Sequence, residues 1–423
     1  MSQYQVTIIP QENYDRVEIA SKIGTYLDDQ NIDISNKTIF LKPSFVFPIS
    51  DQDRTMAVNT NVALVAGVAR AFSDRGARKI TIAENRTLGR ARYAFAMVGI
   101  KEAVKGIQNV KFCYLDEKAT KCVAIKNPFI QGHEIKYPKM LLDETIDYFV
   151  SIPKLKGNNY AGVTLSIKNN FGLISKKERL KHHDDSLHEH LADIALIRQP
   201  DLVITDAIVS GEGNGPSETD PVKTSMLIVG NNCLAVDIAC CYLMEKDPKK
   251  IRHLKLLNER GIGPLDISEV EITNKTYLDT MRKHFSGPDL NLDVHPGLKI
   301  YKGGNICNQG CVAFIRSYLD SYGRNLGWDI LSGMTIIVGK DLDIPDEELK
   351  RLIKKKTIVY GECAKKFKKY GVYFKGCPPD YIKAIFKISL RTKLPYSPYF
   401  QYLSYPKLIK TWIIYLLQRV IRF

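Results

Sequence analysis

The sequence predicts an α/β protein built on a mostly parallel β-sheet that is flanked by helices on both faces. Short apolar runs rich in Val and Ile alternate along the chain with longer segments of helical periodicity, an alternation typical of parallel sheets. No internal repeat and no low-complexity linker interrupts it. The length of 423 residues allows two or three domains. We expect an α/β body over residues 1–296, a smaller cysteine-bearing α/β module over 297–380 and a basic amphipathic helical tail over 381–423.

The strands of the body are predicted from short apolar runs, and its helices from longer Ala-, Leu- or Val-rich segments, several of which end at glycine. The first strand stops at Lys42-Pro43, and the first helix is closed by Gly76. In chain order we expect strands over residues 38–41, 79–83, 110–115, 146–152, 202–205 and 226–229. We expect helices over residues 61–72, from about 89, and over 188–198, 234–244 and 250–260.

The composition is that of a water-soluble globular protein, with 44% hydrophobic and 25% charged residues. The segment Met1–Asp15 is polar and lacks the apolar stretch of a secretion signal. The nine cysteines show no regular disulfide spacing, which favours a reducing compartment, so we expect a cytoplasmic protein. Five of the cysteines lie in apolar stretches and are interpreted as small core residues: Cys113, Cys122, Cys233, Cys240 and Cys241.

Several lysines follow predicted strands, and this is where ligands of parallel α/β sheets bind. Lys42 follows the first strand, Lys154 and Lys156 follow the strand over 146–152, and Lys168-Asn169 lies a little further on. Ammonium groups and backbone amides gathered at one edge of a sheet could bind a phosphate or a carboxylate. We therefore predict a site for an anionic small molecule. The alternative is that each lysine is a solvated surface charge.

A glycine-rich segment after the strand over 202–205 carries two carboxylates, Asp206 and Glu212, together with Asn214. Glycine allows a backbone to approach a ligand closely. The carboxylates could hold a divalent cation or act as a base, or Asp206 could simply cap a turn. The predicted catalytic groups are Lys168, Glu212 and Asp206, and the predicted ligand-binding groups are Lys42, Lys154, Lys156, Asn169 and Asn214.

Four segments of the body together resemble the bacterial and archaeal family known as domain of unknown function 362 (DUF362). They are Lys42-Pro-Ser-Phe-Val46, the stretch over 153–172, the stretch over 206–216 and Val236-Asp237. The resemblance covers roughly residues 36–265. It implies an α/β fold and the positions of these segments, and it implies no reaction.

The chain departs from the usual pattern of the family at several positions. Ser44 stands where the family has Asn, and Gly157-Asn158 occupies a region where a histidine is common. A family role that depends on this histidine therefore does not carry over. The resemblance extends more weakly to the cysteine-bearing module, through its Gly376-Cys-Pro-Pro379 segment.

Four cysteines of the module lie in glycine-containing turns, where their thiolates could converge: Cys307, Cys311, Cys363 and Cys377. Strands are expected over residues 335–339, 357–361 and 372–376, with a helix over 346–352, so that a small α/β unit could present all four at one edge. Four soft thiolates suit a [4Fe–4S] cluster. Zinc is the alternative metal, although it usually prefers two close cysteine pairs, and redox-active or free thiols are the third interpretation.

A run of histidines and acids over residues 182–190 also invites a metal interpretation. On a helix, His188 and His190 point about 200° apart, so this pair cannot bind one metal from a single helix face. We interpret the run as a solvated loop and helix start.

The tail over 381–423 has eight Lys or Arg, no Asp or Glu, and ten aromatic residues. Its last apolar run, 408–423, is shorter than the ~20 residues that span a bilayer. An interfacial helix on anionic lipid fits this pattern, and a helix packed on the protein itself is the alternative. The aromatic residues are too mixed with Ile and Leu for a base-stacking surface, so no specific nucleic acid is expected.

The sequence therefore favours an iron–sulfur protein with an anion-binding cleft, acting as a redox or Lewis-acid enzyme, such as an oxidoreductase or lyase, on an unknown anionic small molecule. A redox partner is a further expectation if the chemistry is redox. The alternative is a non-catalytic metal- or cluster-binding carrier that is peripheral to the inner face of the membrane. Neither a G-x-G-x-x-G fingerprint after the first strands nor a Walker phosphate loop is present, which disfavours nucleotide binding of these types.

Overall fold

The computed structural model describes residues 4–46, 52–85, 90–143, 145–304 and 306–380. The chain divides into two compact units at Asp289/Leu290, here called the large unit and the small unit. The division falls seven residues before the sequence-based boundary at 296. The predicted helical tail over 381–423 lies outside the described residues.

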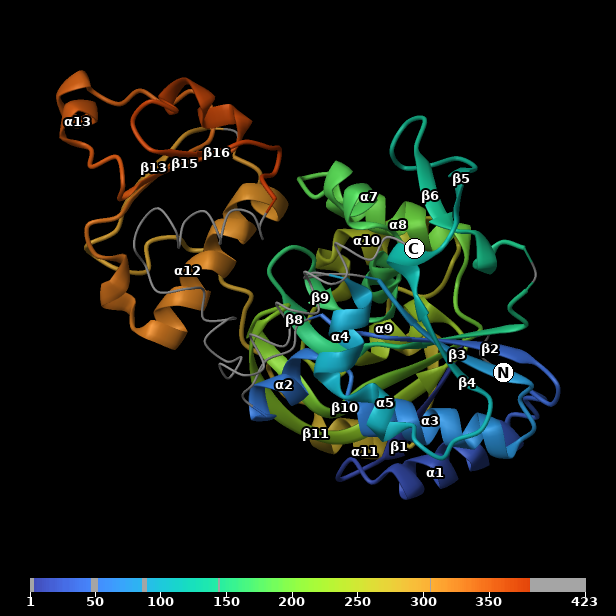
Figure 1. Ribbon diagram of the computed structural model, residues 1–423. Coiled ribbons are helices and arrows are strands. Elements are labelled where there is room, and N and C mark those ends of the chain that lie inside the picture. The colour runs from blue at the N-terminus through green and yellow to red at the C-terminus, as the bar shows by residue number, and fades with distance from the viewer. Residues whose placement is uncertain (1–3, 47–51, 86–89, 144, 305, 381–423) are drawn as a thin grey trace. The chain divides into compact units, whose positions relative to one another are not determined.

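The large unit contains a ten-stranded sheet with the order β12-β1-β11-β10-β7-β2-β3-β4, to which β8 and β9 are attached through β10 (Figure 1). The run from β10 through β7, β2 and β3 to β4 is parallel, and so is the pair β1–β12. The predicted mostly parallel sheet is thereby confirmed. The strands are β1 (Tyr4–Pro10), β2 (Thr38–Pro43), β3 (Lys79–Glu84), β4 (Val110–Tyr114), β7 (Tyr148–Ile152), β8 (Lys154–Asn158), β9 (Gly162–Thr164), β10 (Leu202–Asn214), β11 (Glu218–Gly230) and β12 (Val270–Thr273).

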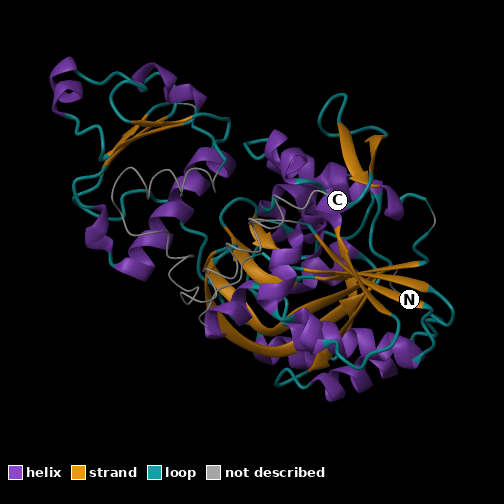
Figure 2. Ribbon diagram, viewed as in Figure 1, coloured by secondary structure: helices purple, strands orange, loops and turns teal. Residues whose placement is uncertain are grey.

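Helices cover both faces of this sheet (Figure 2). One face packs against α1 (Arg16–Asp29) and α3 (Val62–Asp74), whose apolar residues form one core with β2, β3 and β7. The other face packs against α8 (Leu187–Ile197), α9 (Cys233–Leu243) and α10 (Arg252–Glu259). The remaining helices of the unit are α2 (Gln52–Val58), α4 (Ala91–Val98), α5 (Ile100–Ala103), α6 (Ser166–Asn169), α7 (Lys176–Lys181) and α11 (Lys275–Met281).

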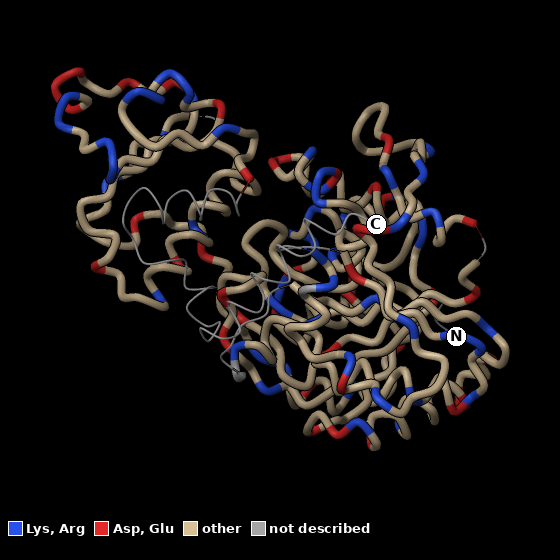
Figure 3. The backbone as a smooth tube through the Cα atoms, viewed as in Figure 1, with Lys and Arg blue, Asp and Glu red and all other residues tan. Residues whose placement is uncertain are grey.

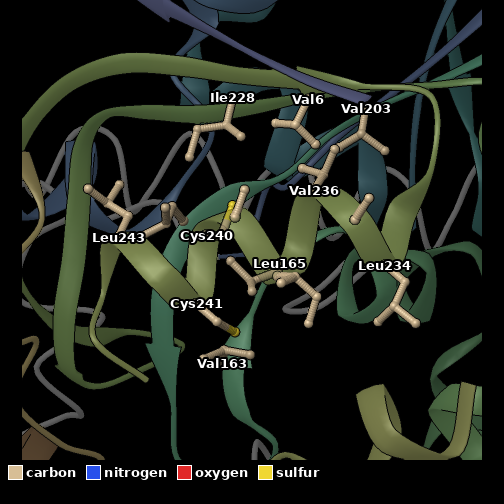
Figure 4. Close-up of a cluster of buried hydrophobic side chains, with 14 of the residues drawn as sticks. Val6, Val163, Leu165, Val203, Ile228, Leu234, Val236, Cys240, Cys241 and Leu243 are labelled. Atoms are coloured by element: carbon tan, nitrogen blue, oxygen red, sulfur yellow. The ribbon is translucent and has the colours of Figure 1, made fainter. Parts of the chain in front are cut away.

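Helix α9 is buried around most of its circumference. Its residues Val236 and Cys240 lie toward the sheet residues Val203 and Ile228, while Cys241 lies near Val163 on the opposite side (Figure 4). The helix therefore lies between the sheet and the β9–α6 segment. Four of the five cysteines expected in the core are buried, whereas Cys122 is exposed on a separate hairpin of β5 (Thr120–Ala124) and β6 (Glu134–Pro138).

One element differs from the prediction in type. The glycine-rich stretch after residue 205 was expected to be a loop, but it continues β10 as far as Asn214 and pairs with β11 in a long antiparallel hairpin. The register shifts between Ala207 and Val209, which marks a bulge. Glycine and polar residues weaken the sequence signal of a strand, and the pairing with β11 supplies the structure that propensity does not.

The small unit is built on a four-stranded parallel sheet, β13 (Lys299–Lys302), β14 (Thr335–Val338), β15 (Thr357–Tyr360) and β16 (Val372–Phe374), in that order. A π-helical turn, η6 (Asn308–Val312), leads into α12 (Ala313–Leu326), and α13 (Asp346–Arg351) connects β14 to β15. The strands expected after residues 335, 357 and 372 and the helix after 346 are all present.

Basic residues do not gather in one part of the described chain. Lys and Arg alternate with Asp and Glu along both units (Figure 3), and the tail alone contributes +8 to the net charge of +15. In the described part of the chain, no helix has the length and apolarity needed to cross a membrane.

Candidate functional site

Two of the predicted lysines form buried ion pairs with carboxylates of neighbouring strands. The Lys42 ammonium lies 2.8 Å from Glu84 at the end of β3 and 3.2 Å from the Asn169 side-chain oxygen. The Lys154 ammonium lies 2.8 Å from Asp206 on β10 and donates to the Val209 carbonyl at 2.7 Å. Both lysines are at most 1% exposed. Burial lowers the pKa of each ammonium, and the partner carboxylate opposes this effect.

Asp206 belongs to the same buried framework. One oxygen accepts a hydrogen bond from the Tyr14 hydroxyl at 2.9 Å, and the other accepts from the Asn61 backbone N–H, besides contacting Lys154. The residue is fully buried. This arrangement joins β8 and β10 to the start of α3 and gives Asp206 a structural role.

Lys156 is fully buried and has no carboxylate partner among the described residues. Its ammonium donates to the carbonyls of Val58 and Pro216, at 2.5 and 2.8 Å. Burial lowers its pKa well below the ordinary value, and the positive charges of Lys154 and Lys168 lower it further.

Lys168 is only partly buried, and its ammonium lies over the Phe171 ring, 4.5 Å from the ring centroid. Within the described chain it makes no hydrogen bond or ion pair. Burial lowers the pKa of Lys168 to about 7, assisted by the nearby charge of Arg179. Lys156 and Lys168 are therefore the predicted ligand-site lysines whose charge no described carboxylate neutralises.

The backbone around Lys168 is held on both sides. Asp237 of α9 accepts hydrogen bonds from the Ser166 N–H and hydroxyl at 2.8 and 2.7 Å and from the Ile167 N–H at 3.1 Å. On the other side, the Asn169 side-chain amide donates to the Lys42 carbonyl and the Ser151 hydroxyl. These contacts fix the short helix α6, and with it the position of Lys168.

Two side chains near this segment have buried polar atoms without a hydrogen-bond partner among the described residues. Asn170 is fully buried, and neither its amide nitrogen nor its oxygen has a hydrogen-bond partner among the described residues. The His253 Nε2 atom is likewise buried and unpartnered. Unsatisfied buried polar groups are rare in proteins and often mark functional positions.

His253 pairs with His188, with their Nδ1 atoms 2.9 Å apart and their rings stacked. The His253 backbone N–H also donates to the His188 Nδ1 atom, which makes that atom the acceptor and places the shared proton on His253 Nδ1. Burial lowers the pKa of His188 to about 4 and that of His253 well below its usual value, with the positive charge of Lys168 contributing for both. The pair is uncharged at neutral pH.

The histidine run is largely buried, contrary to the solvated interpretation: His183, His188 and His190 are each at most 8% exposed. As expected from helix geometry, His190 points away from His188. It contacts His133, whose Nδ1 atom is 2.7 Å from Asp193. Sequence spacing could not reveal these partners, because His133 and His253 lie more than forty residues from the run.

Glu212 and Asn214 lie at the far end of the β10–β11 hairpin. Glu212 accepts a hydrogen bond from the Ser286 N–H, and Asn214 accepts from the Asp289 N–H, each at 2.8 Å. Both side chains hold the segment that ends the large unit. Among the described residues, the two carboxylates of the predicted pair contact different groups: Asp206 contacts Tyr14, Asn61 and Lys154, whereas Glu212 accepts from Ser286.

The four cysteines of the small unit follow strands of one parallel sheet or begin the helix that packs beside it. The Glu362 N–H donates to the Gly376 carbonyl at 3.1 Å, which brings the neighbouring Cys363 and Cys377 turns together. A Cβ atom at Gly361 would lie 3.4 Å from the Cys311 sulfur. The Cys311 N–H in turn donates to the Cys307 sulfur at 3.3 Å.

The thiols thus lie at one end of the sheet, and they differ in how far they are exposed to solvent. Cys311 is buried, Cys307 and Cys363 are half-buried and Cys377 is exposed. A hydrogen bond with Cys307, burial and the neighbouring thiols raise the pKa of Cys311. Within the described ranges, no group of three or more His, Cys, Asp or Glu side chains stands in an arrangement that could hold a metal ion.

Comparison with known proteins identifies the large unit. Residues 39–242 match the model of a family described as a domain of unknown function (DUF362). The matched range makes up slightly less than half of the chain. The resemblance seen in the sequence is confirmed, and the DUF362 match ends before the cysteine-bearing unit. The matched range includes Lys42, Lys154, Lys168 and Asp237. The Val-Asp pair of the DUF362 pattern has a structural role here, because its Asp237 accepts hydrogen bonds from Ser166 and Ile167 of α6.

A curated relative is a thylakoid-associated protein of Synechocystis sp., 29% identical over 124 residues. The match covers 28% of this chain and 39% of the relative, so this chain spans about two fifths of the length of that protein. Among solved structures, a Thermotoga maritima protein aligns over 81% of this chain and 77% of its own, with 12% identity and a TM-score of 0.36.

Proposed function

We propose that the protein is an iron–sulfur protein in which the small unit holds a [4Fe–4S] cluster on Cys307, Cys311, Cys363 and Cys377, and that it acts on an anionic small molecule bound by the large unit. The observation that carries the proposal is the meeting of three cysteine-bearing segments at one end of a parallel sheet. The Glu362–Gly376 hydrogen bond joins two of them, and the Gly361–Cys311 contact adds the third.

The donor set fits such a cluster. Four thiolates are the usual ligands of [4Fe–4S], and a backbone N–H bonded to a ligating sulfur, like that of Cys311 to Cys307, is a common feature that tunes these centres. When bound, the cluster would supply electron transfer or Lewis-acid chemistry. Zinc remains the alternative metal for the same four thiols.

An anionic ligand of the large unit is supported by its uncompensated positive charge. Lys42 and Lys154 have buried carboxylate partners, whereas Lys156 and Lys168 have none among the described residues. A lysine without a carboxylate partner is stabilised in its charged form when an anion binds beside it. The predicted ligand site therefore narrows to the surroundings of Lys168.

The cluster is tested by anaerobic purification of the full chain, followed by analysis of iron, sulfide and zinc. We expect iron and sulfide in stoichiometric amounts and visible absorbance near ~400 nm. The double variant Cys363→Ala, Cys377→Ala should lose both. Cys122→Ala is the matched control, because Cys122 is an exposed cysteine of the large unit, and it should retain them.

Zinc in place of iron would overturn the iron–sulfur proposal and favour a structural metal site. Iron that survives in the double variant would place the cluster on other ligands. Neither outcome bears on the proposed anion site, because that site is in the large unit.

A peripheral membrane protein is the second candidate function. A relative named as thylakoid-associated and the basic, aromatic composition of residues 381–423 favour it. We expect the full chain to sediment with vesicles containing anionic lipid and to be released by salt, because surface charges are screened. A chain ending at residue 380 should stay in solution; equal sedimentation of both chains would contradict membrane binding through the tail.

A further inference from the structure

We propose that Lys168 is a carbonyl-reactive amine, which condenses with a small molecule that carries both a carbonyl group and an anionic group, a 2-oxo acid being the simplest such compound. This inference rests on the proposed anion site and names the substrate class of that site. It is independent of the metal in the small unit.

The first argument is the lack of any partner that would hold Lys168 as an ammonium ion. Lys42 and Lys154 each contact a carboxylate at 2.8 Å, but Lys168 contacts only the face of the Phe171 ring among the described residues. A lysine that is desolvated and placed near another cation loses its proton readily and becomes a nucleophile. Burial and Arg179 lower the pKa of Lys168 to about 7, in agreement with this argument.

The second argument is the fixed position of the amine. Asp237 holds the N–H groups of Ser166 and Ile167, and Asn169 is held by Lys42 and Ser151, so that the residues on either side of Lys168 are both anchored in the core. Lys168 itself remains partly exposed. A nucleophile on a rigid backbone with access from solvent meets the requirement for positioning a reacting atom.

The third argument is the character of the surroundings. The positive charge of Arg179 acts on Lys168, and it would attract the anionic group of a substrate. The neighbouring histidine pair is uncharged, and His253 keeps an unpartnered Nε2 acceptor in a buried position. The surroundings therefore offer the positive charge of Arg179, an amine that loses its proton readily and an acceptor for a hydrogen bond.

The step balances without any other reagent. The Lys168 nitrogen adds to the carbonyl carbon, and a proton moves from nitrogen to the carbonyl oxygen. The second N–H proton then leaves with that oxygen as water, and an imine C=N bond remains. No oxidant or reductant is consumed.

The test is borohydride trapping of the full chain with pyruvate at pH 7.5, followed by peptide mapping. We expect Lys168 to be labelled roughly tenfold to a hundredfold faster than the exposed Lys177 in the same sample, because an ordinary lysine of pKa ~10.4 is almost fully protonated at this pH. Lys168→Arg should lose the label, and the matched variant Lys177→Arg should keep it. Comparison within one wild-type sample does not depend on how any variant folds.

Two further probes separate the parts of the inference. Acetone has the carbonyl without the negative charge, and lactate has the carboxylate without the carbonyl. Lactate should protect Lys168, and acetone should label it much more slowly than pyruvate; equal labelling by acetone and pyruvate would overturn the anionic substrate class. Labelling of Lys168 no faster than Lys177 would overturn the inference. If lactate nevertheless binds, as measured by calorimetry, the anion site of the proposed function stands without the covalent step.

Discussion

Four lysines that look alike in the sequence differ in their electrostatic surroundings. Lys42 and Lys154 each neutralise a buried carboxylate, and they join strands of the sheet. Lys156 is bound by two carbonyls, and Lys168 is bound by an aromatic face. The sequence could place all four after strands, but it could not show which ones have a partner, because Glu84 lies more than forty residues from Lys42 and Asp206 more than fifty from Lys154.

This difference predicts opposite effects of the same substitution. Lys42→Met should lower the unfolding free energy by about 3–5 kcal/mol, because Glu84 would be left buried and unpaired. Lys168→Met should be close to neutral or stabilising at pH 7, because it removes a desolvated charge without a carboxylate partner. Denaturant unfolding of the two variants measures both unfolding free energies. A larger loss of unfolding free energy for Lys168→Met than for Lys42→Met would contradict the conclusion that only Lys42 pairs with a carboxylate.

The effect of Lys168 should also depend on pH in a defined direction. Its pKa is about 7 in the folded protein and near its ordinary value in the unfolded chain. Between these two values the unfolded chain binds more protons, so the stability of the wild type relative to Lys168→Met should rise as pH increases from about 7 toward 10. Unfolding curves at several pH values test the sign.

At the scale of elements, the short helix α6 depends on a residue from a distant helix. Asp237→Ala would leave the N–H groups of Ser166 and Ile167 buried without an acceptor, and we expect a loss of about 3–5 kcal/mol. Asp247→Ala is the control, since Asp247 is an exposed cap of a short turn and its loss should cost about 1 kcal/mol or less. Thermal unfolding compares the two, and similar shifts would contradict a special role for Asp237.

Element types were largely predictable, and the exceptions have a physical cause. Runs such as those beginning at Thr38, Lys79 and Leu202 are strands in the structure, because buried parallel strands have continuous apolar sequences. The part of β10 from Asp206 to Asn214 was interpreted as a loop because glycine and polar residues dominate it. Its strand structure comes from pairing with β11, a long-range contact that local sequence does not encode.

The candidate sites show the same division between local and long-range information. The cysteine turns were recognised from their glycines, and the sequence indicated that a small α/β unit could present them at one edge without showing that they converge. The sequence could not show the contacts that connect these turns. One such contact is the Glu362–Gly376 hydrogen bond, which joins the Cys363 and Cys377 turns. In the large unit, Asp237 was noted as part of the family pattern, but its role appears only when α9 packs beside α6.

At the scale of the whole molecule, the chain combines a DUF362 region with a second unit that carries the thiols. Each unit has its own sheet and its own core, and the core of the small unit includes Ile337, Val359 and Phe367. The proposed function places substrate binding in one unit and the metal centre in the other. Because the four proposed ligands are all cysteines, the proposed function requires a metal bound only through sulfur.

X-ray absorption spectroscopy of the anaerobically purified full chain tests this claim most directly, because it reports both the metal and its ligand atoms. The account predicts iron with sulfur as the neighbouring atoms and a second shell of iron, as in a [4Fe–4S] cluster. Zinc, or a metal with nitrogen or oxygen ligands, would contradict it.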